Sequence, residues 1–243
     1  MAELANAMHP IDISIDELKR WGALWLDATN PETGKAKAPR SFDRQQSVNF
    51  AAFIDMAFAR SLAQMLEGIP VVRPDANSLI LSSPDCVEVG SVRIIGGIRP
   101  QNFDAAYRPD GPRVVFDSKT LNDLKSVGKN WQNMINDLAT EAATIHTRFP
   151  YALVTFMVVI PRPALAAKQE ADLIRTLERL GARRDILDQT HLAEVLSLVI
   201  WDPETGEIDQ TTPLPQSSLR IEKLPTALYP HYVNRYKGLP PHN

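Results

Sequence analysis

The run Val114-Val115-Phe116-Asp117-Ser118-Lys119 constrains the fold of this chain more than any other segment. Its first three residues are β-branched or aromatic, which is typical of a buried strand. A turn sequence, Arg108-Pro109-Asp110-Gly111, stands just before it. Proline presets the second position of such a turn, and glycine accepts a left-handed conformation. Because a second apolar run, Phe103 to Tyr107, precedes the turn, we predict a β-hairpin.

This hairpin carries three charged residues that are candidates for a functional site, Asp104, Asp117 and Lys119. In a strand, residues i and i+2 share a face, so Asp117 and Lys119 project together. Asp104 lies on the preceding strand and shares their face only if the numbers of paired residues sum to an odd value. A type I turn with a bulge at Gly111 gives an even sum. The prediction therefore requires an irregular turn, and Pro112, which cannot donate to the ladder, is consistent with one.

The rest of the chain alternates helical and strand patterns. A capping-box sequence at Ser14 to Glu17 predicts a helix to about Asp27, and apolar spacing predicts further helices from Ser41 to Gly68, from Ser126 to Phe149, and from Ala164 to Leu180. Further strands are predicted at 79–81, 87–95, 151–160 and 193–201. This order predicts an α/β fold with a central mixed β-sheet flanked by helices on both faces. We expect one domain, with N-terminal helices over 11–68, a core over 78–161 and an α/β extension over 164–243.

Composition limits the functional classes. The chain has 243 residues, 44% hydrophobic and 23% charged, which suits a single sizeable core. Its net charge of −3 gives no overall basic field, so any nucleic acid must contact a local patch. The single cysteine, Cys86, excludes an intramolecular disulfide and a cysteine zinc site. Without a signal-peptide pattern or an apolar run long enough to cross a bilayer, we expect a soluble, cytoplasmic protein without a membrane partner.

The order of these motifs resembles that of the PD-(D/E)xK nuclease superfamily, to which restriction endonucleases and many DNA-repair nucleases belong. Members have an acid on one strand, an acid-x-lysine on the next, then a helix and a further core strand. Asp104, Asp117-Ser118-Lys119, the helix near 126–148 and the strand at 151–160 match this order. Phe103 stands where the family usually has a proline. The resemblance covers roughly Val87 to Pro161 and implies a restriction endonuclease-like fold.

Context separates Asp117 from other acids in acid-x-lysine triplets. Such triplets also occur at Glu17 and Asp123, but both of those acids lie near predicted helix starts, where a solvated charge explains them. Asp117 follows three apolar residues, where an unpaired carboxylate is costly to bury. We therefore predict that Asp104, Asp117 and the Ser118 carbonyl hold Mg²⁺, with Mn²⁺ as an alternative ion. Lys119 would orient a water or stabilise charge on the phosphate. The alternative is an ion pair between Asp117 and Lys119, with Asp104 capping a turn.

Further residues complete the predicted site. Nuclease relatives often bring a polar residue from the helix after the motif, and Gln132 is our first choice for this catalytic role. It belongs to a polar stripe with Lys125, Lys129 and Asn136, and the two lysines are predicted nucleic-acid contacts. A solvated helix face explains the stripe equally well. A fourth acid is expected from three candidates, which are Asp55, Glu67 and Glu88.

The C-terminal segment interleaves basic and aromatic residues between Arg220 and Lys237. Such a mixture suits contacts with phosphates and stacking on bases, so we predict Arg235 and Lys237 as nucleic-acid contacts. Packing of this segment on its own domain, or on a second subunit, is the alternative.

These observations predict a Mg²⁺-dependent DNA endonuclease, most like a type II restriction enzyme, that acts as a homodimer. A separate DNA methyltransferase would protect host DNA, because the chain carries no methyltransferase-type motif. A repair or defence nuclease with less sequence preference is a second possibility within this class. Two other interpretations stay open: a catalytically silent binding or assembly module of the same fold, and a hydrolase of small phosphate compounds.

Overall fold

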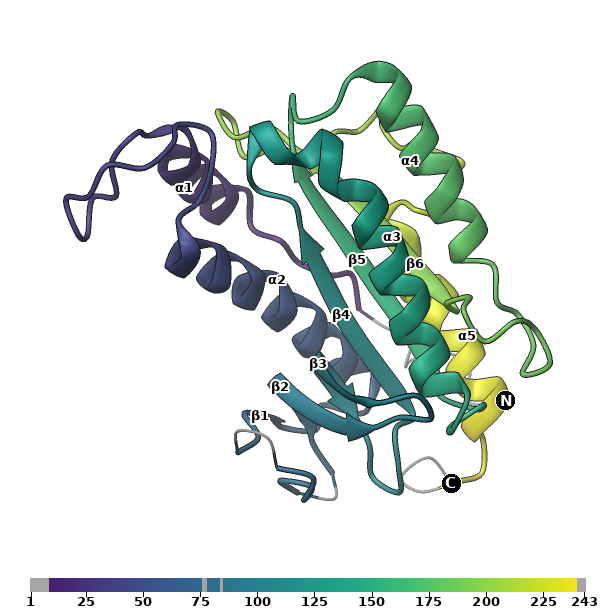
Figure 1. Ribbon diagram of the computed structural model, residues 1–243. Coiled ribbons are helices and arrows are strands. Elements are labelled where there is room, and N and C mark those ends of the chain that lie inside the picture. Colours follow the sequence, from purple (N-terminus) through teal and green to yellow (C-terminus); the bar gives the residue numbers. More distant parts are fainter. Residues whose placement is uncertain (1–8, 76–77, 84, 240–243) are drawn as a thin grey trace.

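A computed structural model describes residues 9–75, 78–83 and 85–239 of the chain (Figure 1). The helices are α1 (Ile15–Leu26), α2 (Arg44–Met65), α3 (Leu124–His146), α4 (Ala167–Leu180) and α5 (Leu224–Tyr236), with a short 3₁₀ helix over Ile221–Lys223. The strands are β1 (Val71–Val72), β2 (Val87–Ile95), β3 (Pro100–Tyr107), β4 (Val114–Thr120), β5 (Leu153–Pro161) and β6 (Val195–Trp201). Within these ranges no helix is both long and apolar enough to cross a bilayer.

The strands form one six-stranded sheet in the order of the sequence. β2, β3 and β4 pair antiparallel, whereas β4, β5 and β6 run parallel and β1 is parallel to β2. The parallel strands follow from the crossovers through α3 and α4, which lie side by side over one face (Figure 1). The opposite face is covered by α2 and α5. The predicted α/β fold with a mixed sheet between two helical layers is therefore confirmed.

Two hydrophobic layers hold the helices beside β4. On one face, Phe58 of α2 stacks on Phe116 of β4 with ring centroids 3.9 Å apart. On the other face, α3 buries Trp131, Leu138 and Ile145 against the sheet. Burying such side chains stabilises the fold by about 1.5–3 kcal/mol each. The carboxyl-terminal half of β4 therefore lies between two firmly packed helices.

The helix starts differ in detail from the predicted ones. α2 is capped by Asp43 rather than Ser41, because Asp43 and Gln46 form a reciprocal capping box, with bonds of 2.9 Å and 3.1 Å. At α1, Ser14 is the N-cap as predicted, but the Glu17 carboxylate pairs with Arg20. α3 begins at Leu124 and is capped by Asp123.

The strand predicted at 79–81 does not form. Leu79 and Ile80 are 53% and 81% exposed, and their carbonyls accept hydrogen bonds from the Arg108 guanidinium instead of a neighbouring strand. The physical reason is that β1, at Val71–Val72, already occupies the edge beside β2. The short apolar run at 79–81 is therefore an exposed loop rather than a strand.

The hairpin between β3 and β4 has the register that the site requires. Ala105 pairs with Phe116 and Tyr107 with Val114, so paired numbers sum to 221, an odd value. The connection is irregular, as expected: Gly111 has a φ of 121°, and the Arg113 amide donates to the Tyr107 carbonyl at 2.9 Å. Continuing this register by one position sets Asp104 opposite Asp117.

Candidate active site

Asp104 and Asp117 meet where β3 and β4 begin to separate. Pairing of the two strands extends only to Ala105 and Phe116. Beyond this point the Asp104 side chain, rather than the β3 backbone, bonds to β4. Its Oδ2 accepts a hydrogen bond from the Ser118 backbone amide at 2.8 Å and one from the Ser118 hydroxyl at 3.4 Å. The amide and carbonyl of one strand residue point to the same side. The Ser118 carbonyl therefore also faces the gap beside Asp104.

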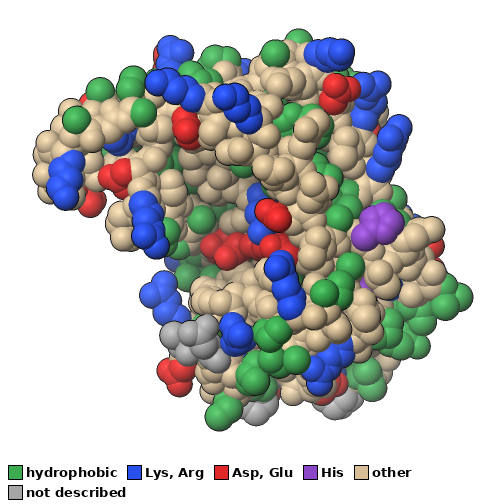
Figure 2. Space-filling view, in the orientation of Figure 1, with side chains coloured by type: hydrophobic (Ala, Val, Ile, Leu, Met, Phe, Trp, Pro, Cys, Tyr) green, Lys and Arg blue, Asp and Glu red, His purple; other side chains and the backbone are tan. Residues whose placement is uncertain are grey.

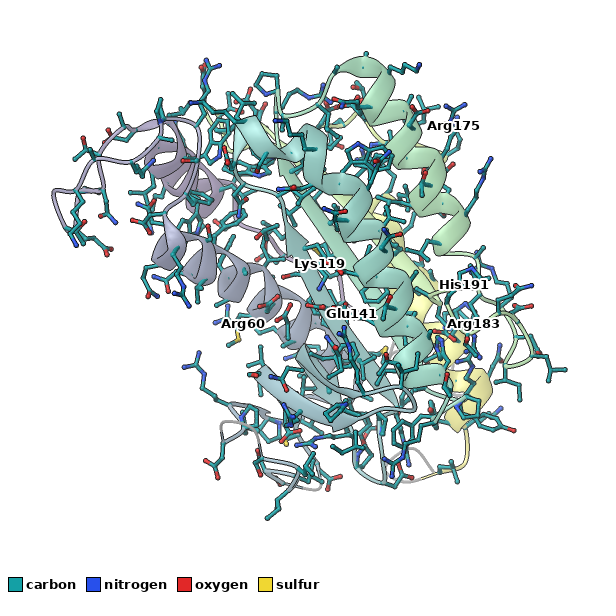
Figure 3. All side chains as sticks on the ribbon, viewed as in Figure 1. Arg60, Lys119, Glu141, Arg175, Arg183 and His191 are labelled. Carbon is teal, nitrogen blue, oxygen red and sulfur yellow. The ribbon has the colours of Figure 1, made fainter. Side chains whose placement is uncertain are left out.

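Lys119 lies on the same face of β4 as Asp117 and is held by two acids. Its ammonium forms an ion pair with Asp117. It also donates to Oε1 of Glu141, on α3, at 2.9 Å. Figure 3 shows Lys119 and Glu141 close together between β4 and α3. The structure thus brings together the four residues predicted at the hairpin and adds Glu141, which the sequence analysis did not select.

Asp55, one of the three candidate acids, approaches the same point from α2. It is only 5% exposed, and within the described part of the chain its Oδ1 has no hydrogen-bond partner. Burial and the nearby charge of Asp104 raise the pKa of Asp55 to about 8, while Ser118 and Lys119 oppose the shift. A buried carboxyl beside another carboxylate is typical of functional sites.

The other two candidate acids lie elsewhere. Glu67 is exposed beyond the end of α2. It follows Asp55 by twelve positions, which corresponds to roughly 18 Å along a helix. Glu88, on β2, is fully buried and forms an ion pair with Arg108, and it also accepts hydrogen bonds from Ser82. Its carboxylate is therefore occupied in a separate structural network.

The electrostatics of the site favour an added positive charge. Burial, and then the adjacent Asp104, raise the pKa of Asp117 well above its usual range, although Lys119 opposes the effect. Two carboxylates this close repel each other, and a cation between them would offset the repulsion. In the described ranges, however, no group of three or more His, Cys, Asp or Glu side chains is arranged to hold a metal ion. A divalent ion placed between the two carboxylates would have Asp104, Asp117 and the Ser118 carbonyl as available donors, with water completing its shell.

A cleft gives access to Lys119. It has a volume of about 440 Å³ and lies between the end of β4 and one face of α3. Its lining residues are Ser118, Lys119, Thr120, Leu121, Asn130, Asn133, Met134 and Asp137. In Figure 2, acidic side chains gather on the floor of a hollow between the α1–α2 side of the molecule and α3. The cleft itself reaches Ser118 and Lys119. Of the nearby acids, Asp104 is half-buried, whereas Asp55, Asp117 and Glu141 are buried.

The structure does not bring Gln132 to this cleft. Gln132, Lys125 and Lys129 are all exposed on α3. Gln132 lies nine positions before Glu141, which is about 180° around the helix, so the two side chains leave opposite faces. The face that does line the cleft carries Asn130, Asn133 and Asp137. The sequence does contain a pattern that could have indicated Glu141. This acid interrupts the apolar positions of α3, just as Asp117 interrupts those of β4.

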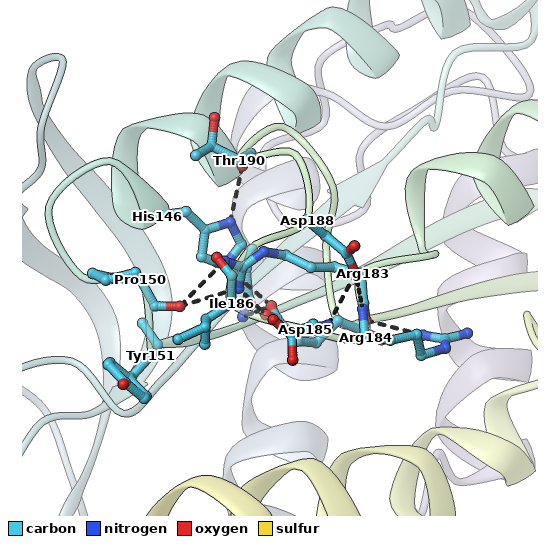
Figure 4. A network of polar contacts seen from close by, with 12 residues as sticks. His146, Pro150, Tyr151, Arg183, Arg184, Asp185, Ile186, Asp188 and Thr190 are labelled. Carbon is cyan, nitrogen blue, oxygen red and sulfur yellow. Dashed lines mark hydrogen bonds and ion pairs between the residues drawn. The ribbon is translucent and has the colours of Figure 1, made fainter.

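Arg235 packs inside the protein rather than facing a ligand. It donates to Glu194 at 2.8 Å and to the carbonyls of Tyr151 and Ala152. Glu194 also pairs with Arg183 and His146, in the network shown in Figure 4. The position of Arg235 agrees with the alternative, packing of the C-terminal segment on its own domain, and its role as a nucleic-acid contact stays a prediction. Lys237 is exposed just after α5.

We expect Arg235→Ala to lower the free energy of unfolding by about 2–3 kcal/mol, because it removes one partner from a buried carboxylate. Glu194 keeps Arg183 and His146, which limits the loss. Urea denaturation measures the effect, with Lys237→Ala as the exposed control, expected within about 0.5 kcal/mol of wild type. An Arg235→Ala protein of unchanged stability but weakened DNA binding would contradict this assignment.

Comparison of the chain with protein-family models, with curated protein sequences and with solved structures finds no match. The fold is α/β, built on a six-stranded mixed sheet. The site is defined by its own geometry: two carboxylates at the point where two strands diverge, a lysine on the same strand, and one further acid from each of α2 and α3.

Proposed function

We propose that the protein is a Mg²⁺-dependent DNA endonuclease of the PD-(D/E)xK type. The observation that carries this proposal is the position of Asp104 beside Asp117, with Lys119 two residues further along the same strand. A carboxylate pair with an adjacent ammonium suits phosphodiester hydrolysis, in which negative charge develops on the phosphate. The site offers both the anionic donors for a metal ion and a cation for that phosphate.

The order of elements supports a restriction endonuclease-like fold. The acid lies on β3, the acid-x-lysine on β4, and α3 leads into the core strand β5, which is parallel to β4. This is the order implied by the resemblance to the superfamily, and α2 precedes it on the opposite face of the sheet. A fold alone does not define an activity, so the proposal rests on the site rather than on this likeness.

Each residue has a defined task in the proposed reaction. Asp104, Asp117 and the Ser118 carbonyl would hold the ion, which supplies polarisation of the phosphate and a water of lowered pKa when bound. Burial lowers the pKa of Lys119, but the charges of Asp117 and Glu141 outweigh this effect and raise it overall. Lys119 therefore stays charged at neutral pH and can hydrogen-bond to the attacking water or to a phosphate oxygen. Asp55 adds a further carboxyl on the α2 side.

A catalytically silent binding module is the second candidate. It is favoured by the ion pair that Lys119 forms with Asp117 and by the lack, in the described segments, of a group of three or more possible metal ligands. Such a module needs no divalent ion for its function. Metal-dependent cleavage therefore separates the two candidates directly.

The test is incubation of the purified protein with several plasmids, in Mg²⁺ and in chelator, followed by mapping of the ends. We expect cleavage only with the ion. Discrete fragments indicate a restriction enzyme with a recognition sequence, whereas a smear indicates a less specific repair or defence nuclease. Turnover of small phosphate compounds without plasmid cleavage would instead favour a small-molecule hydrolase. Intact plasmid under every condition, with no such turnover, favours the silent module.

The proposal includes a homodimer, in which two sites cut the two strands of a duplex. Sedimentation or light scattering with and without DNA tests this arrangement. A companion DNA methyltransferase belongs to the proposal only if the fragments are discrete, because a nonspecific nuclease is not restrained by site methylation.

A further inference from the structure

We propose that Glu141 is a positioning residue that holds Lys119 in the site independently of Asp117. In this arrangement the Asp117 carboxylate can bind a divalent cation while the Lys119 ammonium keeps Glu141 as an acidic partner. The cation step rests on the proposed function, whereas the pairing of Glu141 with Lys119 does not.

The geometry fixes Glu141 firmly. It projects from the buried face of α3, and its side chain is only 6% exposed. Oε1 accepts a hydrogen bond from the Lys119 ammonium at 2.9 Å and another from the side-chain Nε2 of Gln101 at 3.2 Å. The Gln101 bond ties the same oxygen to β3, the strand that carries Asp104. Glu141 is therefore held by contacts with both β3 and β4.

Lys119 needs a second acceptor because a bound cation would compete with its ammonium for the Asp117 carboxylate. The Lys119 side chain is 22% exposed, so most of its partners must come from the protein. If a cation takes the Asp117 oxygen, an ammonium with no other acid would be left largely desolvated, which is costly. Glu141 prevents this loss, because its charge remains beside the ammonium.

Glu141 can also accept a further hydrogen bond. Its Oε2 is buried and, among the described residues, accepts no hydrogen bond. An ammonium has three donors, so Lys119 can keep its bond to Oε1 and direct another to Oε2 once Asp117 is engaged elsewhere. The unpartnered oxygen thus has a defined use in the cation-bound state.

The first test uses metal-free protein and asks whether the two residues are energetically coupled. Melting temperatures are measured in chelator for wild type, Glu141→Gln, Lys119→Met and the double variant. We expect the loss in the double variant to be clearly smaller than the sum of the single losses. Glu88→Gln is the matched control, since it breaks a buried ion pair with Arg108 that is separate from Lys119, and its effect should add to that of Lys119→Met.

The second test measures Mn²⁺ affinity in the same set of variants. Glu141→Gln should weaken Mn²⁺ binding roughly 10-fold when Lys119 is present, because the lysine then competes for Asp117. In the Lys119→Met background the same change should cost about 2-fold or less, since no ammonium remains to be accommodated. Glu88→Gln should leave Mn²⁺ affinity unchanged in both backgrounds.

Cleavage gives a readout that a purely structural role would not change. Glu141→Gln should lower kcat with an unchanged KM for plasmid, because Lys119 is misplaced while the DNA-contacting surface is intact. Additive melting shifts for Glu141 and Lys119 would overturn the positioning role. The positioning role would also be overturned if Glu141→Gln weakened Mn²⁺ binding as much in the Lys119→Met background as it does when Lys119 is present. That result would indicate that Glu141 is a metal ligand. If no variant binds Mn²⁺ but the melting shifts are non-additive, the pairing stands and the proposed nuclease function fails.

Discussion

Asp117→Asn protein is expected to cleave plasmid DNA on the order of 10³-fold more slowly than wild type in Mg²⁺, because the change removes an anionic oxygen from the position where the ion would bind. The fold should survive the substitution. Burial and the adjacent Asp104 raise the pKa of Asp117, so its charged form is disfavoured in the folded protein. A neutral amide of the same shape relieves that cost, and metal-free Asp117→Asn should be at least as stable as wild type.

The chain supplies a matched control for this variant. Asp123 stands in the second aspartate-x-lysine triplet but is exposed and caps α3. Asp123→Asn keeps a capping side chain, so we expect near-normal cleavage and stability. Gel-based initial rates and circular dichroism of both variants measure these effects. Retained cleavage in Asp117→Asn, or an equal loss in Asp123→Asn, would contradict the assignment of the site.

Asp55→Asn is expected to stabilise the metal-free protein at pH 8, by about 2–3 kcal/mol. The pKa of Asp55 rises from 3.8 to about 8 in the folded state. Between these values the folded protein keeps a proton that the unfolded chain has lost, so stability falls as pH rises from about 4 to about 8. A rise of this size in the pKa corresponds to at most about 6 kcal/mol of stability, which relaxation and water entry reduce.

Urea denaturation in chelator, repeated between about pH 5 and about pH 9, measures this effect. The stability of Asp55→Asn should depend less steeply on pH than that of wild type, with the remaining slope due partly to Asp117. Identical pH profiles for Asp55→Asn and wild type would mean that Asp55 is ionised normally and is not part of an acidic cluster.

The central part of the site could be predicted because it depends on local rules. Strand alternation placed Asp117 and Lys119 on one face, and the irregular loop at Gly111 and Pro112 gave the odd register that sets Asp104 opposite Asp117. The burial of Asp117 followed from its apolar neighbours. The mixed sheet with two helical layers followed from the order of strand and helix patterns.

The remaining contacts depend on packing between distant segments. The rotation of α3 decides whether Gln132 or Glu141 faces Lys119, and this rotation is set by Trp131 and Leu138 in the core. The choice among Asp55, Glu67 and Glu88 likewise depends on tertiary partners, such as Arg108 for Glu88. Arg235 pairs with Glu194, 41 residues earlier in the chain, through a network that no local pattern indicates.

The central claim is that Asp104 and Asp117 together bind a divalent cation, and a Mn²⁺ titration followed by electron paramagnetic resonance tests it most directly. Measurements on wild type, Asp104→Asn, Asp117→Asn and the Asp123→Asn control suffice. We predict saturable binding in wild type and Asp123→Asn, and its loss in each of the other two variants. Binding that persists in both Asp104→Asn and Asp117→Asn, or that is missing from wild type, would contradict the account.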